Sequence, residues 1–317
     1  MRILVTGAHG FAGSHLLSEL ARAGHQITAG VYGPVEREVV ANGVRWVSLD
    51  ITSDESTRAA IRASQPEQIY HLAGQASVGE SFRTPQQTWD VNATGTLRVL
   101  EALRQEGLGS SRLLLTSSAE VYGAVAPADQ PVGEHVPLRP LTPYGASKAA
   151  AEMVGVQFAR SGMAEVVIAR SFNHIGPGQD ERFVLPSFAR QLALIKRGML
   201  EPVLHVGNLD VRRDFLDVRD GVRGYLAIME RGENGEAYNV CSGESRLLEE
   251  VVTKLVELSN TGAQLVVDPD RVRAVDIPTL SGDSSRLRSL GWSPRFALNQ
   301  TLDDLLRDAE TRAPAHG

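Results

Sequence analysis

Hydrophobic and polar positions alternate in blocks along the first half of the chain. Short apolar runs, typical of strands buried on both faces, are separated by segments in which apolar residues recur with helical spacing. Strand–helix alternation of this kind predicts parallel strand pairing, with helices on both faces of one sheet. The strands are expected at Ile3–Val5, Ile27–Val31, Val44–Leu49, Gln68–His71, Arg112–Thr116 and Glu165–Ala169.

The segments between these strands carry helix start and stop signals. In GSHLLSELARAG the leucines share one helical face, and Gly24 suits the C-terminal end. SDESTRAAIRAS begins with Ser and Asp caps and closes before Pro66. TWDVNATGTLRVLEALRQEG predicts one longer helix.

The alternation breaks after Ala169, where Gly, Pro and charged residues become frequent. Further helices are expected near Ser187–Lys196, Glu249–Ser259 and Asn299–Thr311, and a strand in AYNVCSG. We therefore predict an α/β fold, a Rossmann-type doubly wound parallel sheet with a smaller mixed α/β C-terminal substrate lobe.

The chain is expected to cross between these two parts more than once. The nucleotide-binding domain is predicted at residues 1–170 together with about 210–241, and the substrate lobe at 171–209 and 242–317.

Composition narrows the class of protein. The 317 residues are 42% hydrophobic and 22% charged, as in soluble globular proteins, and the formal charge of −6 argues against a nucleic-acid partner. No segment approaches the ~20 apolar residues of a membrane span, and the first residues do not resemble a signal peptide. The single cysteine, Cys241, allows no internal disulfide, which suits a cytoplasmic location. The eight histidines form no recognised metal motif, so no metal is predicted.

A glycine loop follows the first strand. VTGAHGFAG places Gly7, Gly10 and Gly13 between that strand and an amphipathic helix. Glycines permit the tight turn and let the backbone approach a pyrophosphate at the helix N-terminus. The spacing is G-x-x-G-x-x-G, and its strand–turn–helix context predicts a dinucleotide site.

The end of the second strand bears on the choice of cofactor. Dinucleotide folds usually place an acid there for the ribose diol, but Val31, Tyr32 and Gly33 supply none, and Arg37 follows closely. NADP(H) is therefore favoured, while NAD(H) stays possible. Asp50, after the third strand, is placed to reach the adenine.

TPYGASKAAAEM contains a Tyr-x-x-x-Lys pair, Tyr144 and Lys148, which a helix places on one face. An unperturbed tyrosine has a pKa of about 10, and a neighbouring ammonium is expected to lower it. The pair could then exchange a proton with a sugar oxygen while hydride moves at the adjacent carbon.

These motifs, with TSS upstream, resemble the extended branch of the short-chain dehydrogenase/reductase superfamily, which acts mostly on nucleotide sugars. HLAGQASV, SFNHIGPGQ, GNLDVRRDFLDVRD, YNVCSG and IPTLSGD narrow the resemblance. Together they look like GDP-4-keto-6-deoxy-D-mannose reductases, which form GDP-D-rhamnose and are kin to GDP-mannose 4,6-dehydratases. The resemblance implies a nucleotide-diphosphate sugar as substrate, with a GDP-sugar favoured.

The resemblance also implies roles for individual residues. Ser118 and Tyr144 would hydrogen-bond the reacting C4 oxygen, and Lys148 would bind the nicotinamide ribose. The implied cofactor set is Gly7, Gly10, Phe11, Ala12, Gly13, Tyr32, Asp50, Ile51, Leu72, Ala73, Gly74, Tyr144, Lys148 and Phe172. The implied substrate set is Ser77, Ser118, Asn173, Val184, Arg190, Arg213, Arg273 and Asp276.

Within the substrate set, Arg213 would pair with the diphosphate, because the planar guanidinium meets phosphate oxygens in pairs. Asn173 would touch the substrate near that diphosphate. Val184 and Arg190 would lie near the base, and Arg273 and Asp276 would close the nucleotide end.

The residues after Ser118 bear on the reaction. In dTDP-glucose 4,6-dehydratases an Asp–Glu pair follows the hydroxyl residue, whereas this chain has Ala119 and Glu120. Because Ala119 supplies no proton, we predict reduction of a C4 ketone. Ala119 alone does not rule out dehydration, since GDP-mannose dehydratases keep only the Glu, and Glu120 is either chemical or structural.

Two alternative functions and one assembly are also considered. A 4,6-dehydratase or 4-epimerase that retains NAD(P) is the second interpretation. A non-catalytic nucleotide sensor is the third, although sensors often lack the Tyr–Lys pair. A homodimer is expected through the helices matching Thr88–Glu106 and Tyr144–Arg160.

Overall fold

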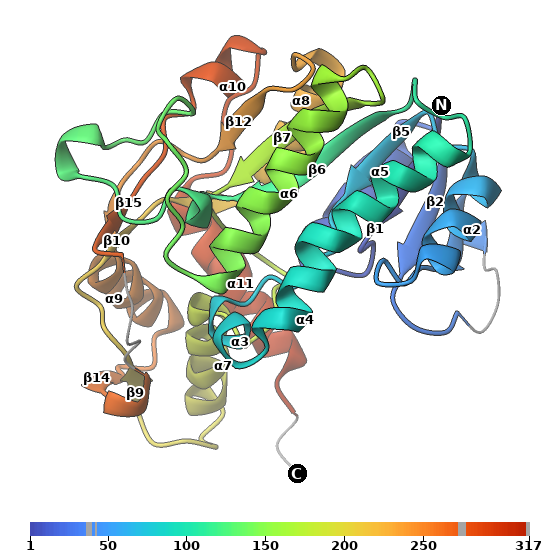
Figure 1. Cartoon of the computed structure of the whole chain (residues 1–317). Coiled ribbons are helices and arrows are strands. Elements are labelled where there is room, and N and C mark those ends of the chain that lie inside the picture. The colour runs from blue at the N-terminus through green and yellow to red at the C-terminus, as the bar shows by residue number, and fades with distance from the viewer. Residues whose placement is uncertain (36–39, 42, 272–276, 315–317) are drawn as a thin grey trace.

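A computed structural model describes residues 1–35, 40–41, 43–271 and 277–314 (Figure 1). At its centre is a sheet with strand order β12-β7-β6-β5-β1-β2-β4-β3. These strands are β1 (Arg2–Thr6), β2 (Gln26–Val31), β3 (Val40–Ala41), β4 (Val44–Ser48), β5 (Gln68–His71), β6 (Arg112–Ser118), β7 (Glu165–Ser171) and β12 (Ala237–Val240). All are parallel to their neighbours except β3, which pairs with β4 in the antiparallel sense. The six strands predicted in the first half of the chain are all present.

The strand order reverses between β1 and β5. From β1 the chain passes to β2 and then to β3 and β4, and it crosses back to place β5 on the other side of β1. Ligands of doubly wound sheets bind outside the carboxyl ends of the strands at such a reversal.

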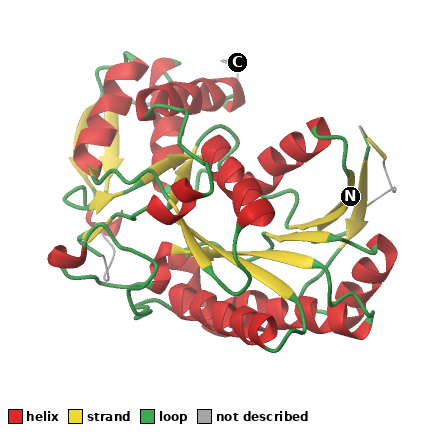
Figure 2. Ribbon diagram, turned by 90° about the horizontal axis from the view of Figure 1, so that it is seen from above, coloured by secondary structure: helices red, strands yellow, loops and turns green. Residues whose placement is uncertain are grey.

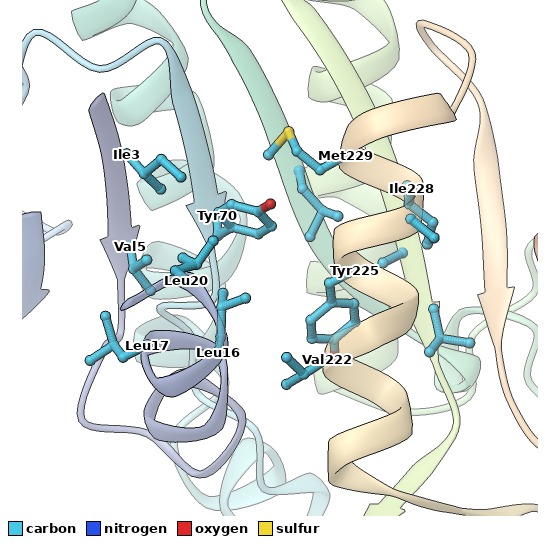
Figure 3. Packing of buried hydrophobic residues seen from close by; sticks show 14 of the residues in the cluster. Ile3, Val5, Leu16, Leu17, Leu20, Tyr70, Val222, Tyr225, Ile228 and Met229 are labelled. Atoms are coloured by element: carbon cyan, nitrogen blue, oxygen red, sulfur yellow. The ribbon is translucent and has the colours of Figure 1, made fainter. Parts of the chain in front are cut away.

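Helices cover both faces of the sheet (Figure 2). One face is covered by α1 (Phe11–Arg22), α8 (Val218–Arg231) and the short α10 (Ser285–Ser289), and the other by α2 (Asp54–Ser64), α5 (Gly95–Gln105) and α6 (Pro143–Arg160). Figure 3 shows leucines of α1 and the apolar side of α8 packed against residues of β1 and β5. Each helix thus buries its apolar stripe against the sheet, as its spacing predicts.

The long helix predicted before β6 is interrupted. The structure has α4 (Pro85–Trp89), a π-helical turn at Asp90–Thr94 and then α5, with a separate α3 (Val78–Arg83) before them. The turn brings Asn92 inward, where its side chain bonds the backbone at Gln75. Such π-turns within helices frequently occur at functional sites.

The C-terminal part has its own apolar core. It is built from α7 (Val184–Lys196), α9 (Leu248–Ser259), α11 (Leu298–Arg312) and the pair β9 (Val203–Val206) and β14 (Gln264–Val267). Small sheets connect it to the rest: β8 (Asn173–Ile175) with β11 (Phe215–Asp217), and β10 (Arg212–Arg213) with β13 (Arg246–Leu247) and β15 (Thr279–Leu280). Short 3₁₀ turns lie at Ala119–Val121, Pro127–Asp129 and Pro269–Arg271.

The junction between the two parts is polar and buried. The Asp217 carboxylate caps α8 by accepting from Arg219 N (2.8 Å), and it also accepts from Thr301 Oγ1 of α11 (2.7 Å). Arg219 donates to Asp304 of α11 (2.7 Å). Among the described helices, none is long and apolar enough to cross a bilayer.

Candidate active site

The glycine loop lies at the reversal of strand order. Gly7 has a φ of 67°, and a Cβ there would lie 2.7 Å from the backbone nitrogen of Ala73, just after β5. A Cβ at Gly13 would lie 2.5 Å from the Gly7 carbonyl oxygen, to which Gly10 N donates (2.9 Å). The loop therefore brings the N-terminus of α1 close to the ends of two strands. The close packing leaves no room for a side chain at Gly7 or Gly13, and the resulting glycine loop at the N-terminus of α1 fits a dinucleotide pyrophosphate.

The residues that follow the loop form the first turn of α1. Phe11 and Ala12 are half-buried, and the Phe11 ring packs edge-on against His15, with ring centroids 5.7 Å apart. His9 of the loop stacks on Trp46 of β4, with ring centroids 4.6 Å apart. That contact joins the loop to the strand beside β2.

The chain just after β2 is exposed to solvent. Tyr32 is 85% exposed, and Gly33, with a φ of 102°, has open space where a Cβ would stand. Asp50, after β4, accepts from the backbone and hydroxyl of Thr52 (2.9 and 2.7 Å), and the neighbouring Ile51 is buried. Arg37 lies outside the described residues.

A buried chain of hydrogen bonds begins beside the loop, at the end of β1. Ala73 N donates to Thr6 Oγ1 (3.1 Å), which lies 2.9 Å from His71 Nδ1. His71 Nε2 lies 3.2 Å from Thr96 Oγ1, which donates to the Asn92 carbonyl (2.7 Å). Every group has a consistent role if Thr6 donates to Nδ1 and neutral His71 donates from Nε2. Burial, and then the charge of Lys148, lower the pKa of His71 to about 3, so the ring is neutral.

Asn92 extends this chain to α6. Its side chain accepts from Gln75 N (2.9 Å) and donates to Gln75 O (3.1 Å) and to Ser147 Oγ (3.0 Å). Ser147 Oγ in turn donates to the Tyr144 carbonyl (2.7 Å). A Cβ at Gly74 would lie 3.0 Å from Asn92 Oδ1 and 3.3 Å from Lys148 Nζ. The segment containing Leu72, Ala73 and Gly74 is thus held against the Tyr–Lys helix.

The Tyr–Lys pair and Ser118 come together at the ends of β6 and α6. Thr142 caps α6 by accepting from Gly145 N (2.9 Å), so Tyr144 lies in the first helical turn. The Tyr144 hydroxyl hydrogen-bonds the Ser118 side chain, and Lys148 Nζ donates to the Thr116 carbonyl (2.9 Å). Tyr144, Ser118 and Lys148 are all buried.

The predicted lowering of the Tyr144 pKa is wrong for this structure. Burial raises the pKa of Tyr144 to about 12; the hydrogen bond with Ser118 opposes the rise, and the charge of Glu120 adds to it. Burial also lowers the pKa of Lys148 to about 8, against the opposing charge of Glu152. Near neutral pH, Tyr144 therefore holds its proton and can donate it.

The turn after Ser118 is a 3₁₀ helix that begins at Ala119. Ala119 is buried in an apolar cluster with Val121 and Tyr122. Glu120 is half-buried, and its N–H donates to Ser118 Oγ (3.2 Å). The turn thus aims the Ser118 hydroxyl, while the Glu120 carboxylate acts on Tyr144 through its charge.

The predicted substrate residues before α7 lie on separate elements. Ser77 caps α3 by accepting from Glu80 N (3.2 Å). Phe172 is buried beside the Tyr122 ring, and Asn173 donates from both N and Nδ2 to the Asp214 carbonyl (3.2 and 3.1 Å).

Arg213 lies on β10 and is held by carbonyl groups. Its Nη1 donates to the Ile277 carbonyl (2.6 Å) and to that of Arg212 (2.9 Å). Val184 is exposed at the start of α7, and Arg190 of the same helix pairs with Glu181 (2.6 Å).

The remaining two residues of the predicted substrate set, Arg273 and Asp276, lie outside the described residues. Within the part of the chain that is described, no three His, Cys, Asp or Glu side chains are grouped so as to hold a metal ion.

Comparison with known proteins places the chain in a family. The model of the GDP-mannose 4,6 dehydratase family matches residues 4–305. The chain belongs to that family. The superfamily and fold predicted from the motifs are thereby confirmed.

This dehydratase-family chain is similar to proteins of more than one activity. It is 38% identical over 315 residues to the GDP-6-deoxy-D-mannose reductase of Pseudomonas aeruginosa, covering 98% of each chain. It is 28% identical to a GDP-mannose 4,6-dehydratase of Vibrio cholerae, covering 99% of this chain and 94% of the other.

Among solved structures, RMD from Pseudomonas aeruginosa complexed with NADPH has a TM-score of 0.87 at 37% identity, covering 98% of this chain and 99% of that one. The UDP-glucose 4-epimerase of Thermus thermophilus in complex with NAD also has a TM-score of 0.87, at 28% identity, covering 99% of this chain and 100% of the other.

Three residues that organise this family member's site were not predicted from the sequence. His71 and Asn92 belong to the hydrogen-bond chain beside the loop, and Asp214 accepts four donors from two other segments. HLAG and VNATG contain the first two, but nothing in the spacing distinguishes a buried hub from an ordinary polar residue.

Proposed function

We propose that the chain reduces the C4 ketone of GDP-4-keto-6-deoxy-D-mannose to give GDP-D-rhamnose, with NADPH as the reductant. The observation that carries the proposal is the buried Tyr144–Ser118 pair, in which Tyr144 keeps its proton. Similarity to a GDP-6-deoxy-D-mannose reductase over 98% of the chain supports the same reaction.

In this proposal the side chains divide the work at C4. Bound NADPH supplies the hydride that converts the C4 ketone to an alcohol. Ser118 and Tyr144 hydrogen-bond the ketone oxygen, and Tyr144 gives it the balancing proton, which solvent later replaces. General acid catalysis of this kind is typically worth ~10²–10⁴-fold. Lys148 would hold the nicotinamide ribose.

The cofactor would lie along the reversal of strand order. The pyrophosphate would rest on Gly7, Gly10, Phe11, Ala12 and Gly13, because the close packing at Gly7 and Gly13 brings the N-terminus of α1 to the reversal of strand order. The other proposed cofactor contacts are Tyr32, Asp50, Ile51, Leu72, Ala73, Gly74 and Phe172. The end of β2 supports NADPH over NADH, since the described residues that follow it, 32–35, carry no carboxylate that would repel a 2′-phosphate.

The nucleotide sugar would be bound between the sheet and the C-terminal part of the chain. Arg213 would pair with its diphosphate, with Ser77 and Asn173 nearby and Val184 and Arg190 toward the base. The separate core of α7, α9 and α11, and the return of α8 and β12 to the central sheet, support the proposed division into a domain at 1–170 with about 210–241 and a lobe of the remaining residues. A homodimer is also proposed, paired through the helices at residues 88–106 and 144–160. A cytoplasmic location is proposed because the single cysteine allows no internal disulfide.

A second candidate is a GDP-mannose 4,6-dehydratase. Glu120 favours it, because this half-buried carboxylate next to Ser118 could take a proton from the substrate, as a dehydration requires. Similarity to GDP-mannose 4,6 dehydratase 2 of Arabidopsis thaliana supports the same alternative. The two sequences are 31% identical over 94% of this chain.

Proton NMR of two reaction mixtures separates the candidates. With GDP-4-keto-6-deoxymannose, we expect one NADPH consumed per turnover and a rhamnose-configured product, and with GDP-mannose no reaction. A 4-keto-6-deoxy product from GDP-mannose would identify a dehydratase. Steady-state kinetics with both reduced cofactors test the cofactor, and a hundredfold preference for NADH would contradict the proposal.

A further inference from the structure

Helix α6 carries a second ionisable residue one turn beyond Lys148. Glu152 follows Lys148 by four positions, so their Cβ atoms lie about 5–6 Å apart on the same side of the helix. Lys148 is 7% exposed and Glu152 only 1%. A carboxylate this close to a buried ammonium is poorly screened by water or salt.

Glu152 is bound by an arginine from the central sheet. Arg170 of β7 donates from Nε to both carboxylate oxygens (3.1 Å each) and from Nη2 to Oε2 (2.8 Å). Its Nη1 donates to Tyr122 OH (2.9 Å) and to the Glu134 carbonyl (3.1 Å). The guanidinium is therefore fixed on three sides, and it stays charged because Glu152 holds the Arg170 pKa above its ordinary value despite burial.

Among the described residues, the other polar groups that approach Lys148 are neutral near pH 7. Thr116 offers a carbonyl, His71 of β5 is uncharged, and Tyr144 on the same helix keeps its proton. The neutral side-chain amide of Asn92 lies near Lys148, since a Cβ at Gly74 would contact both side chains. Glu120 lies at the Tyr144 end of the site, where its charge acts on that hydroxyl. The ion pair of Glu152 and Arg170 thus brings two full charges to the far side of Lys148.

We propose that Glu152 and Arg170 are positioning residues that determine over which pH range Lys148 stays charged. Glu152 stabilises the ammonium, and Arg170 limits that stabilisation by neutralising most of the carboxylate's charge. The inference rests on the proposed function only in assuming that cofactor binding and turnover need the charged form of Lys148. It deepens that function by adding a pair that touches neither cofactor nor substrate.

The two halves of the pair have opposite effects on Lys148. In Glu152→Gln the attraction of the carboxylate one turn away is lost and the Arg170 charge is left unpaired, so Lys148 loses its proton at lower pH. In Arg170→Gln the Glu152 carboxylate turns to Lys148 and holds its proton to higher pH. An unneutralised charge beside a buried ionisable group commonly moves its pKa by one unit or more, so the pH at which Lys148 loses its proton should move by about one unit in each variant.

The measurement is the pH dependence of kcat/KM for NADPH, which reports the groups of the free enzyme. Since the pKa of Lys148 is about 8, activity of the wild-type chain should fall as the pH rises past that value. The falling limb should lie lower in Glu152→Gln, higher in Arg170→Gln, and near its original place in the double variant. Glu152→Asp and Arg170→Lys keep the charges but disturb the geometry, and their limbs should stay in place.

Each glutamine variant tests the proposal by itself, because each is expected to shift the falling limb of the pH profile in its own direction. The position of that limb does not depend on what fraction of the protein folds. Shifts in the same direction, no shift, or an equal shift in Glu152→Asp would mean that the pair acts only as a structural brace. The NADPH dissociation constant, followed by cofactor fluorescence over the same pH range, should move in the same way. Because that measurement needs no sugar, it tests the inference even if the proposed substrate is wrong.

Discussion

Asp214 gives a direct test of how the substrate side of the site is held. Its side chain is fully buried and accepts from Ser242 N (2.8 Å), Ser242 Oγ (2.7 Å), Gly243 N (2.9 Å) and Gly282 N (3.4 Å). Its backbone carbonyl accepts from Asn173. One residue thus joins β8 and β11 to the loops that follow β12 and β15.

In Asp214→Asn the new amide nitrogen cannot accept a hydrogen bond. Placed at Oδ2, it faces the N–H groups of Gly243 and Gly282, and placed at Oδ1 it faces both donors of Ser242. Each buried donor left without an acceptor costs about 1–3 kcal/mol. Burial raises the pKa of Asp214, against the donors that oppose it, so removing the charge returns part of the loss. We therefore expect a net loss of about 2–4 kcal/mol in the free energy of unfolding.

Equilibrium urea unfolding at pH 7 measures this loss, and Asp180→Asn is the matched control. Asp180 is exposed and accepts from Arg182 N (2.9 Å), so its change should stay within about 0.5 kcal/mol. The sugar KM of Asp214→Asn should rise more than the dissociation constant of NADPH, because the loops it joins lie on the side proposed to bind the substrate. A loss below about 1 kcal/mol, or equal effects on sugar and cofactor, would refute this reasoning.

The remaining predictions concern single residues. Tyr144→Phe should lower kcat by ~10²–10⁴-fold with little change in cofactor affinity, and a variant keeping more than half the activity would refute its role as the acid. Arg213→Ala should raise the sugar KM by about ten- to a hundredfold, the equivalent of about 1.5–3 kcal/mol, whereas an unchanged KM would refute its pairing with the diphosphate. The folded-state pKa of His71, about 3, lies below its unfolded value, so the unfolded chain binds the extra proton first and wild-type stability should fall as the pH drops below about 6.5. By urea unfolding, His71→Gln should be less stable than the wild type at pH 7, but its stability should fall less steeply between pH 7 and pH 5. Part of the remaining fall comes from His174, whose pKa burial lowers to about 4. An unchanged pH dependence of stability would contradict a buried neutral His71 ring.

The elements predicted from the sequence are those whose signal is local. The apolar runs of β1, β5 and β6 indicate strands that are buried on both faces, whatever their neighbours in the sheet. The glycine loop depends on backbone constraints within a few residues. The Tyr144–Lys148 pair needs only the helical repeat. Each of these patterns carries its own physical reason within one element.

Helix α8 was not predicted, although its apolar residues recur with helical spacing (Figure 3). Gly221 and Gly224 weaken its helix propensity, and only tertiary packing shows why they are there. A Cβ at Gly221 would lie 2.6 Å from the His174 ring, and one at Gly224 would lie 3.1 Å from Val240. Close packing against the sheet therefore outweighs propensity at both positions.

The hubs of the site could not be predicted because they join residues far apart in sequence. Asn92 bonds Ser147, and Asp214 reaches Gly282, so the partners lie 55 and 68 positions away respectively. The same holds for the two short strands β8 and β11, which pair across the proposed lobe boundary. No periodicity within one segment carries that information.

The Tyr144 pKa shows how burial changes a chemical expectation, and it also bears on the direction of the reaction. A neighbouring ammonium favours the phenolate, but the hydroxyl is buried and the charge of Glu120 adds to the cost of ionising it. A tyrosine that holds its proton is a donor, which suits reduction of a ketone. An epimerase or dehydratase must first oxidise C4, and for that step the tyrosine has to accept a proton. The small Ala119 lets the turn pack into its apolar cluster and supplies no second acid. Burial thus keeps Tyr144 protonated, and the turn aims Ser118 without adding a second acid, which supports the reductase over its redox-neutral relatives.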